Sequence, residues 1–283
     1  GSYPALPLPS QRGAKAGGCI AFRDMTAYRF CFYQGGGVSG IMNAIVQNAL
    51  PPEMLETTGL PGMAPAAKHD WLRVDEAYAA QLQRRLALLE TQRADVLWMD
   101  PAALKAAREV LDQTLALLPD MGFQVRAGRV VCPDGRTVTP DHDAPLLTLG
   151  QLVQEDICLL HKQGDEHVLV GAVLCFPASW RLAEKAGKPL IGIHEPVAEY
   201  DADLARRVQR LFDGVRAGRP LWRFNRLWYD DAELHQPRSS TAPRRIRPDQ
   251  TAAPYIRSER QCVVRMPVSD VVVFSIHTYV VRT

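Results

Sequence analysis

Strand-like apolar runs occur at five places in the second half of the chain. They cover residues 154–161, 168–176, 221–229, 261–266 and 271–281. The turn residues Gln163-Gly164-Asp165 join the first two runs as a hairpin. Two strands, then helices, then three strands predict an α+β domain. Its five-stranded antiparallel sheet is expected to carry helices on one face.

Helical periodicity is clearest in residues 201–218, where Asp201 or Asp203 provides the N-cap. One face of this helix is formed by Leu204, Val208, Leu211, Phe212 and Val215, and Gly218 ends it. Shorter helical pieces are expected around 179–186 and 195–200.

Two earlier helices are expected within residues 69–120, one capped by Asp75 and one beginning at Asp100-Pro101. We expect them to form an antiparallel hairpin that packs on a larger structural unit. Residues 132–148 are polar and rich in turn residues, which indicates a boundary there.

The chain therefore divides into three expected parts. Residues 1–68 form an N-terminal arm and loop region, 69–147 a helical hairpin region, and 148–283 the α+β domain. The element order of the last part is that of a PAS domain, a fold with a pocket between its sheet and its helices. A helical N-terminal region thus precedes a PAS-like domain.

Composition limits the classes of function. The formal net charge is +2, with 33 Lys+Arg against 31 Asp+Glu, which argues against nucleic-acid binding. The longest apolar runs, such as 271–276, are too short for a membrane helix, and no secretory signal is recognisable. None of the six cysteines forms a C-x-x-C pair, so zinc-ribbon and iron–sulfur sites are disfavoured. A reducing, cytoplasmic compartment is expected.

Short motifs give little support to other enzyme classes. Residues 35–40 match the G-x-G-x-x-G pattern of dinucleotide-binding proteins, but residues 53–65 look like a loop where a second strand should follow. A flexible glycine turn is therefore the preferred interpretation. Neither H-E-x-x-H nor G-x-S-x-G occurs, which disfavours zinc and serine hydrolases.

A series of ordered motifs lies between Thr148 and Tyr279. They are Leu152-Val-Gln-Glu-Asp156, Phe176-Pro177-x-x-Trp180, Lys185-x-Gly187-x-Pro189-Leu190, Ile193-His194-x-Pro196-Val197, Arg219–Asn225, Glu233-Leu-His-Gln-Pro237, Glu259-Arg260-Gln261, and Pro267-x-Ser269 leading to Thr278-Tyr279. Trp71-Leu72-x-x-Asp75-x-x-Tyr78 precedes them. In these motifs the chain resembles the haem-dependent oxidative N-demethylase family, the α-subunit of dimethylamine monooxygenase-type enzymes. It departs from the family pattern at His277, where arginine is expected.

The resemblance implies a PAS-like domain that binds haem b and uses it for catalysis. The family demethylates a secondary methylamine such as dimethylamine with dioxygen and external electrons, giving a primary amine and formaldehyde. Because the chain has no credible flavin or NAD fingerprint and no Cys₄ spacing, a haem enzyme of this kind must receive its electrons from partner proteins. A hetero-oligomer with flavin and iron–sulfur subunits is expected.

The resemblance also implies roles in haem binding. His194 is the expected axial ligand of the iron, with His235 as the alternative. Arginine suits carboxylates best, so Arg223 and Arg260 are expected to bind the haem propionates, with Lys185 next. Taken alone, however, Arg260 beside Glu259 is typical of a surface charge pair.

Dimethylamine is a cation at neutral pH and needs a carboxylate or an aromatic face. Glu195 is the first candidate to bind and deprotonate it, and Glu155, Asp156 and Tyr200 are alternatives. Thr278 is expected to donate a hydrogen bond to oxygen at the iron.

Three other functions remain open from the sequence. A haem-PAS gas sensor would bind the cofactor without turnover, although no output module or long coiled-coil linker is recognisable. A dinucleotide-binding oxidoreductase would use the glycine pattern at 35–40. A non-catalytic α+β domain would use the motifs only for core packing.

Overall fold

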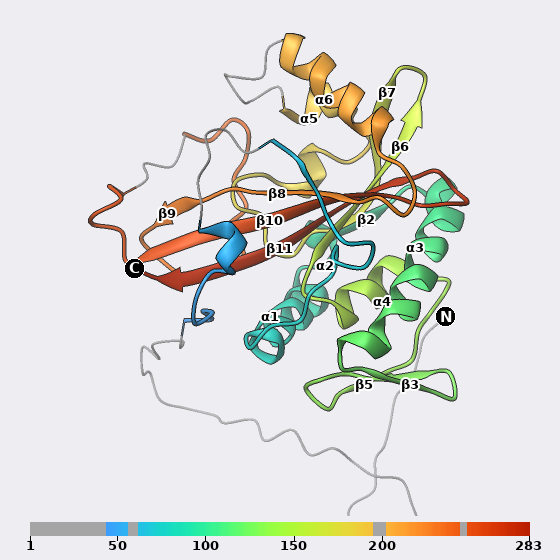
Figure 1. Ribbon diagram of the computed structural model, residues 1–283, viewed down its shortest axis with the longest axis horizontal. Helices are drawn as coiled ribbons and strands as arrows, with labels where there is room; N and C mark the ends of the chain where they lie inside the picture. The colour runs from blue at the N-terminus through green and yellow to red at the C-terminus, as the bar shows by residue number, and fades with distance from the viewer. Residues whose placement is uncertain (1–43, 56–61, 195–201, 244–247) are drawn as a thin grey trace, which may run out of the picture. The chain divides into compact units, whose positions relative to one another are not determined.

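The computed structural model describes residues 44–55, 62–194, 202–243 and 248–283 (Figure 1). The chain divides after Met42, and every described residue belongs to the unit 43–283. The glycine pattern at 35–40 and the helical piece expected at 195–200 lie outside the described residues.

One antiparallel sheet of eight strands organises this unit. Its strands are β1 (Ala64–Pro65), β2 (Leu97–Met99), β6 (Asp156–Gln163), β7 (Glu166–Val173), β8 (Leu221–Phe224), β9 (Leu227–Tyr229), β10 (Tyr255–Arg265) and β11 (Val272–Arg282). Their order is β1-β8-β10-β11-β6-β7-β2, and β9 also pairs with β10. A separate small sheet contains β3 (Gln124–Arg126), β4 (Arg129–Val131) and β5 (Thr137–Val138).

The expected hairpin is confirmed as β6 and β7, and the runs near the C-terminus are confirmed as β10 and β11. The run 221–229 is split into β8 and β9. The expectation of five strands was wrong because β1, β2 and β9 extend the sheet with only two or three residues each. Such short segments carry no measurable periodicity.

The described helices are α1 (Tyr78–Thr91), α2 (Arg93–Val96), α3 (Leu104–Leu117), α4 (Pro145–Leu152), α5 (Leu190–His194) and α6 (Ala202–Gly214). Asp100 accepts a hydrogen bond from the Ala102 N–H, 2.9 Å away, and so caps the turn that leads into α3. Asp75, expected as the N-cap of α1, lies two residues before the observed cap, Ala77.

The two helices expected as a hairpin are α1 and α3, and they do not follow each other directly. Leu97–Met99 adds β2 to the sheet edge between them, and α4 packs against both helices. One core cluster joins residues from Trp71 to Val138 with residues from Leu146 to Val280. The division at residue 147 stays a prediction.

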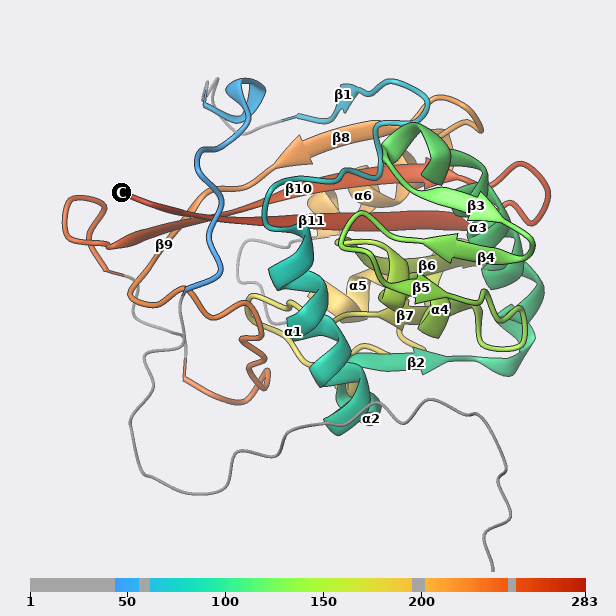
Figure 2. The ribbon, with the colours of Figure 1, turned by 90° about the horizontal axis from the view of Figure 1, so that it is seen from below.

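Helices cover both faces of the sheet, not one face as expected (Figure 2). The faces follow from the alternation of side chains along each strand. Ile157 and Leu159 of β6 belong to the core cluster under α1, α3 and α4. Cys158 and Leu160 of the same strand belong to a second cluster that includes Phe212 of α6. The sequence pattern missed this because strands buried on both faces read as continuous apolar runs.

Candidate functional site

A cavity of about 330 Å³ lies between the sheet and the α5–α6 side of the unit. Its size is that of a small-molecule pocket. Apolar side chains form most of its walls, and several charged or polar side chains, including Arg223, Gln261 and Glu259, lie together on the sheet. The sheet contributes Cys158, Leu160, Leu169, Arg223, Glu259, Gln261, Val263, Phe274 and Ile276, and the other segments contribute Leu174, Phe176, Trp180, Glu184, Lys185, Leu190, Ile193, Val208, Leu211, Phe212, Arg238 and Ser240.

The sheet wall changes from apolar to polar along its strands. On β10 the residues that face the cavity are Val263, Gln261 and Glu259, two apart as the pleat requires. Phe274 and Ile276 of β11 lie opposite Val263 and Gln261 in the register. The apolar end therefore lies toward Val263 and the polar end toward Glu259.

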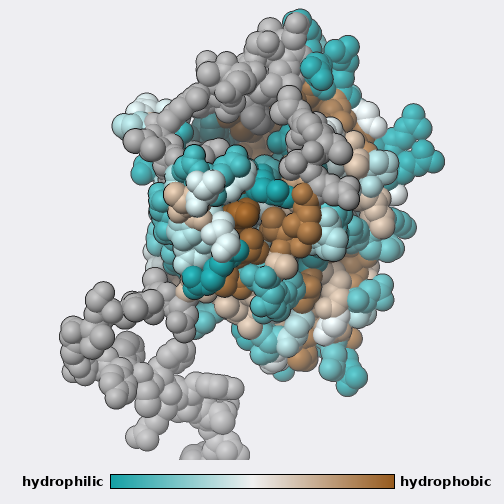
Figure 3. Space-filling model, turned by 60° about the vertical axis from the view of Figure 1, so that its left-hand side comes forward, coloured by the Kyte–Doolittle hydropathy of each residue, from teal (hydrophilic) through white to brown (hydrophobic). Residues whose placement is uncertain are grey.

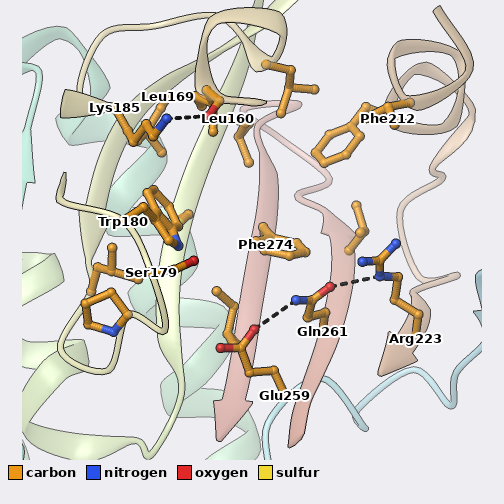
Figure 4. A pocket seen from close by; sticks show the side chains of 18 of the residues that line it. Leu160, Leu169, Ser179, Trp180, Lys185, Phe212, Arg223, Glu259, Gln261 and Phe274 are labelled. Carbon is orange, nitrogen blue, oxygen red and sulfur yellow. Dashed lines mark hydrogen bonds between the residues drawn. The ribbon is translucent and has the colours of Figure 1, made fainter. Parts of the chain in front are cut away.

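A strip of hydrogen bonds runs across the polar end (Figure 4). Nε of Arg223 donates to Oε1 of Gln261 over 2.9 Å, and Nε2 of Gln261 donates to Oε2 of Glu259 over 3.1 Å. Asn225 Nδ2 donates to the same Glu259 oxygen over 3.0 Å. Because these bonds fix the direction of the Gln261 amide, the strip holds a positive group at one end and a carboxylate at the other.

The opposite wall comes from the segment after β7 and from α5. Trp180 and Lys185 line it, and Nζ of Lys185 donates to the carbonyl oxygen of Ile193 in α5. Lys185 is only 4% exposed, so this bond ties the last turn of α5 from inside the protein. Lysine at a helix C-terminus also interacts favourably with the helix dipole.

The structure brings two of the predicted cofactor-binding residues to this cavity, Arg223 and Lys185. It does not bring Arg260 or His235 there. His235 lies after β9, where its Nδ1 donates to the carbonyl oxygen of Cys175 over 2.8 Å. Donation to a carbonyl places the ring proton on Nδ1.

Three further predicted residues, His194, Glu195 and Tyr200, lie at the end of α5 or after it in the sequence. The backbone of His194 ends α5, directly after the lining residue Ile193, but its side chain lies outside the described part of the structure. Glu195 and Tyr200 also lie outside the described residues.

Thr278, the remaining predicted catalytic residue, lies directly opposite Glu259 in the register of β10 and β11. Directly opposed residues in an antiparallel pair point to the same face. Thr278 therefore points to the same face as Phe274 and Ile276, although it is not itself one of the residues that line the cavity. It is 1% exposed, and no described group lies within hydrogen-bonding distance of its hydroxyl.

Arg260 projects from the other face of β10. Its Nη2 lies 2.7 Å from Oδ2 of Asp70, its Nη1 donates to the Asp70 carbonyl, and its guanidinium stacks 4.9 Å from the Trp222 ring centroid. It is 2% exposed. Arg260 and Glu259 are both buried, so the expectation of a surface charge pair was wrong: neighbours in a strand point to opposite faces.

His277 is the register partner of Arg260 on that same face. Its Nδ1 lies 2.8 Å from Oε1 of Glu155, and its Nε2 lies 3.0 Å from Oδ2 of Asp75. Burial alone lowers the pKa of His277, but the two carboxylates outweigh it and raise the pKa to about 9. Burial disfavours the charged form of Asp75, yet His277 holds the pKa of that carboxyl at about 2. The position thus holds a cation, as the arginine expected there from the resemblance would.

The two alternative amine-binding acids, Glu155 and Asp156, are engaged elsewhere. Glu155 accepts from the backbone N–H of Arg73 as well as contacting His277. Asp156 accepts from the N–H groups of Cys175 and Phe176 and pairs with Arg85 at 2.7 Å. Neither lines the cavity.

Sequence reasoning missed Glu259 and Gln261 as cavity residues, although both belong to a motif it singled out. The available signal was the two-residue period of β10, which places them on the same face as Val263. It also missed Arg238, which lies in the irregular segment after β9 and has no periodic pattern to follow.

Among the described residues, no group of three or more His, Cys, Asp or Glu side chains is arranged to hold a metal ion. No helix in that part of the chain has the length and apolar character needed to cross a membrane.

A family model described as "Haem-dependent oxidative N-demethylase, alpha subunit-like" matches residues 62–283. No curated protein is similar enough to the chain to count as a match.

Proposed function

Because the chain belongs to the haem-dependent oxidative N-demethylase alpha-subunit-like family, we propose that it binds haem b in the cavity beneath α6 and demethylates a secondary methylamine such as dimethylamine. Dimethylamine, one dioxygen, two electrons and two protons would give methylamine, formaldehyde and one water. The observation that carries the proposal is the cavity itself, which combines apolar walls with cations. Its position between sheet and helices also supports a PAS-like description of residues 148–283.

The residues of the cavity fit a haem. A porphyrin needs apolar walls, and Leu160, Phe212 and Phe274 belong to the walls of this cavity. Its propionates need cations, and Arg223 and Arg238 line the cavity. When bound, the haem would supply the activation of dioxygen.

An axial ligand must also be available. Cys158 also lines the cavity, and burial and nearby Asp156 raise the pKa of its thiol. We assign the iron to His194, which follows the lining residue Ile193. Lys185 supports this assignment because it binds the Ile193 carbonyl and so holds the end of α5.

The chain's own residues would position the substrates. We assign Arg223 to a haem propionate and Thr278 to a hydrogen bond with dioxygen. The proposal from sequence that Glu195 and Tyr200 act on the amine remains, because an amine must lose its proton before or during oxidation. Arg260 was proposed for a propionate as well. We assign it instead to the ion pair with Asp70.

Electrons must reach the site from other proteins. We propose flavin and iron–sulfur partner subunits in a hetero-oligomer, which the words "alpha subunit" in the family description support. Figure 3 shows one face of the molecule on which apolar side chains gather, with hydrophilic ones around them. A face of this kind is suited to contact with another protein.

The test is an absorption spectrum of the purified protein after haem is supplied, before and after addition of dimethylamine. We expect a Soret band that shifts with the amine and is lost or displaced in His194→Ala. A Soret band that responds to gases but not to amines would instead indicate a haem sensor. No Soret band at all would exclude the demethylase.

A further inference from the structure

The polar end of the sheet wall contains two acceptor atoms that no described donor fills. Oε2 of Glu259 accepts from Asn225 and Gln261, but Oε1 has only Nη2 of Arg257 nearby, at 3.7 Å, beyond hydrogen-bonding distance. The hydroxyl oxygen of Thr278 has no partner among the described groups. Buried polar atoms are nearly always paired, so the Thr278 hydroxyl indicates a missing partner, while Oε1 of Glu259 belongs to a side chain that lines the cavity and can accept from a ligand there.

The two acceptors belong to neighbouring positions. Glu259 and Thr278 oppose each other in the register of β10 and β11, so their side chains share the sheet face that forms the cavity wall. Glu259 lines the cavity, and Thr278 lies two residues beyond the lining residue Ile276 without being part of the lining itself. Opposed Cβ atoms in an antiparallel pair lie about 4.5–5.5 Å apart. A single small group can therefore contact both side chains.

The negative charge of Glu259 is only partly balanced. The side chain of Glu259 is 10% exposed and faces the cavity, so its charge acts in a largely desolvated place. Arg257 is the nearest cation, but its Nη1 donates to the Leu234 carbonyl and its Nη2 to the Phe176 carbonyl. Both Nη atoms of Arg257 therefore donate to backbone oxygens. A further cation beside Glu259 would be electrostatically favourable.

We propose that Glu259 and Thr278 accept hydrogen bonds from the two N–H donors of a secondary ammonium ion, while the Thr278 hydroxyl keeps its own proton to donate to dioxygen. The inference rests on the proposed function and adds to it the residues that select the substrate. A secondary ammonium has two N–H groups, which matches the two unfilled acceptors. Trp180 and Phe274 line the same cavity, and their ring faces are suited to the N-methyl groups of a cation (Figure 4).

The arrangement makes a prediction about amine class. Dimethylammonium fills both acceptors, trimethylammonium fills only one, and tetramethylammonium fills neither. All three carry one positive charge. Affinity should therefore fall in that order, in steps of about tenfold, since a hydrogen bond to a charged group contributes about a factor of ten or more.

The experiment is titration calorimetry of the haem-loaded chain with the chlorides of these three amines. In Glu259→Gln we expect dimethylammonium to bind at least tenfold more weakly. In Thr278→Val we expect about tenfold weaker binding of dimethylammonium and nearly unchanged binding of tetramethylammonium. Glu184→Gln is the matched control, because Glu184 lines the same cavity but its Oε2 accepts from the Ser240 N–H, 2.8 Å away.

The outcomes separate this inference from the proposed function. Equal affinities of the unchanged chain for all three amines would overturn the inference, and that measurement needs no variant to fold. So would unchanged dimethylammonium binding in both Glu259→Gln and Thr278→Val, with the loss found in Glu195→Gln. Failure of the unchanged chain to take up haem would overturn the proposed function alone, since the amine series can still be titrated against the haem-free chain.

Discussion

Arg223 and Arg260 project from opposite faces of the same sheet. Arg223 pairs in register with Gln261, which faces the cavity, whereas Arg260 pairs with Phe224 and bonds to Asp70 on the other side. The two arginines were expected to serve one cofactor. Their placement predicts different roles, and the difference can be measured.

Arg260→Met is expected to lower the free energy of unfolding by about 2 kcal/mol, because it removes a buried charge contact and the stacking on Trp222. Haem affinity should be unchanged. Arg223→Ala should do the reverse and weaken haem binding about tenfold at nearly unchanged stability. Urea denaturation and haem titration of both variants check this. A tenfold loss of haem affinity in Arg260→Met would return Arg260 to the cofactor.

The charged state of His277 predicts a dependence of stability on pH. The pKa of His277 is about 9 in the folded protein, against an ordinary value of 6.5. A pKa raised by folding contributes stability that is complete below pH 6.5 and disappears as the pH rises through about 9. The free energy of unfolding should therefore fall by a few kcal/mol across this window.

His277→Gln should remove most of that fall, because glutamine does not titrate. The check is urea denaturation of both proteins at several pH values from 6 to about 10. His142→Gln is the control, since His142 is about half exposed where it meets Asp112 and should behave as the unchanged chain. Parallel curves for the unchanged chain and His277→Gln would show that His277 is not the group responsible.

The fold was predictable wherever one element carries its own pattern. The β6–β7 hairpin and the amphipathic α6 each show their period within one short stretch. The edge strands β1 and β2 do not, because pairs of two or three residues depend on the neighbouring strand. The second helical layer was also missed, since an apolar run does not show that both of its faces are covered.

For the candidate site, the sequence singled out some of the cavity residues but not the contacts that hold them. Arg223 and Lys185, which were predicted to bind the cofactor, both line the cavity, but their partners, Gln261 and the Ile193 carbonyl, are set by tertiary contact. The buried site around His277 joins it to Asp75, 202 positions away. No local pattern indicates such a contact, so the charge at His277 could not be inferred from sequence.

Asp156 was an alternative for binding the amine, and its contacts predict a structural role instead. Asp156→Asn removes the charge that faces fully buried Arg85 and replaces one of two acceptor oxygens by a donor. We expect a loss of about 3 kcal/mol in stability, the cost of leaving a buried charge uncompensated. Amine affinity of the folded protein at low temperature should be unchanged.

The control for Asp156 is Asp213→Asn, which breaks the partly exposed contact with Lys162 at 2.6 Å and should cost less than about 1 kcal/mol. Urea denaturation gives the stabilities, and calorimetry with dimethylammonium gives the affinities. A folded Asp156→Asn protein that no longer binds the amine would contradict the structural role.

Lys185 can act on a haem in two ways, by binding a propionate or by holding the end of α5. Its bond to the Ile193 carbonyl leads us to expect the second. If Lys185 fixes the end of α5, Lys185→Met loosens the turn that carries His194 and weakens haem binding about tenfold. The size of this loss should not depend on whether the haem carries charged propionates. Haem and its dimethyl ester, titrated in parallel, should then lose affinity equally. Arg223→Ala should affect haem alone, and exposed Lys188→Met should affect neither ligand. A loss in Lys185→Met confined to haem would mean that Lys185 acts on a propionate and not through the helix.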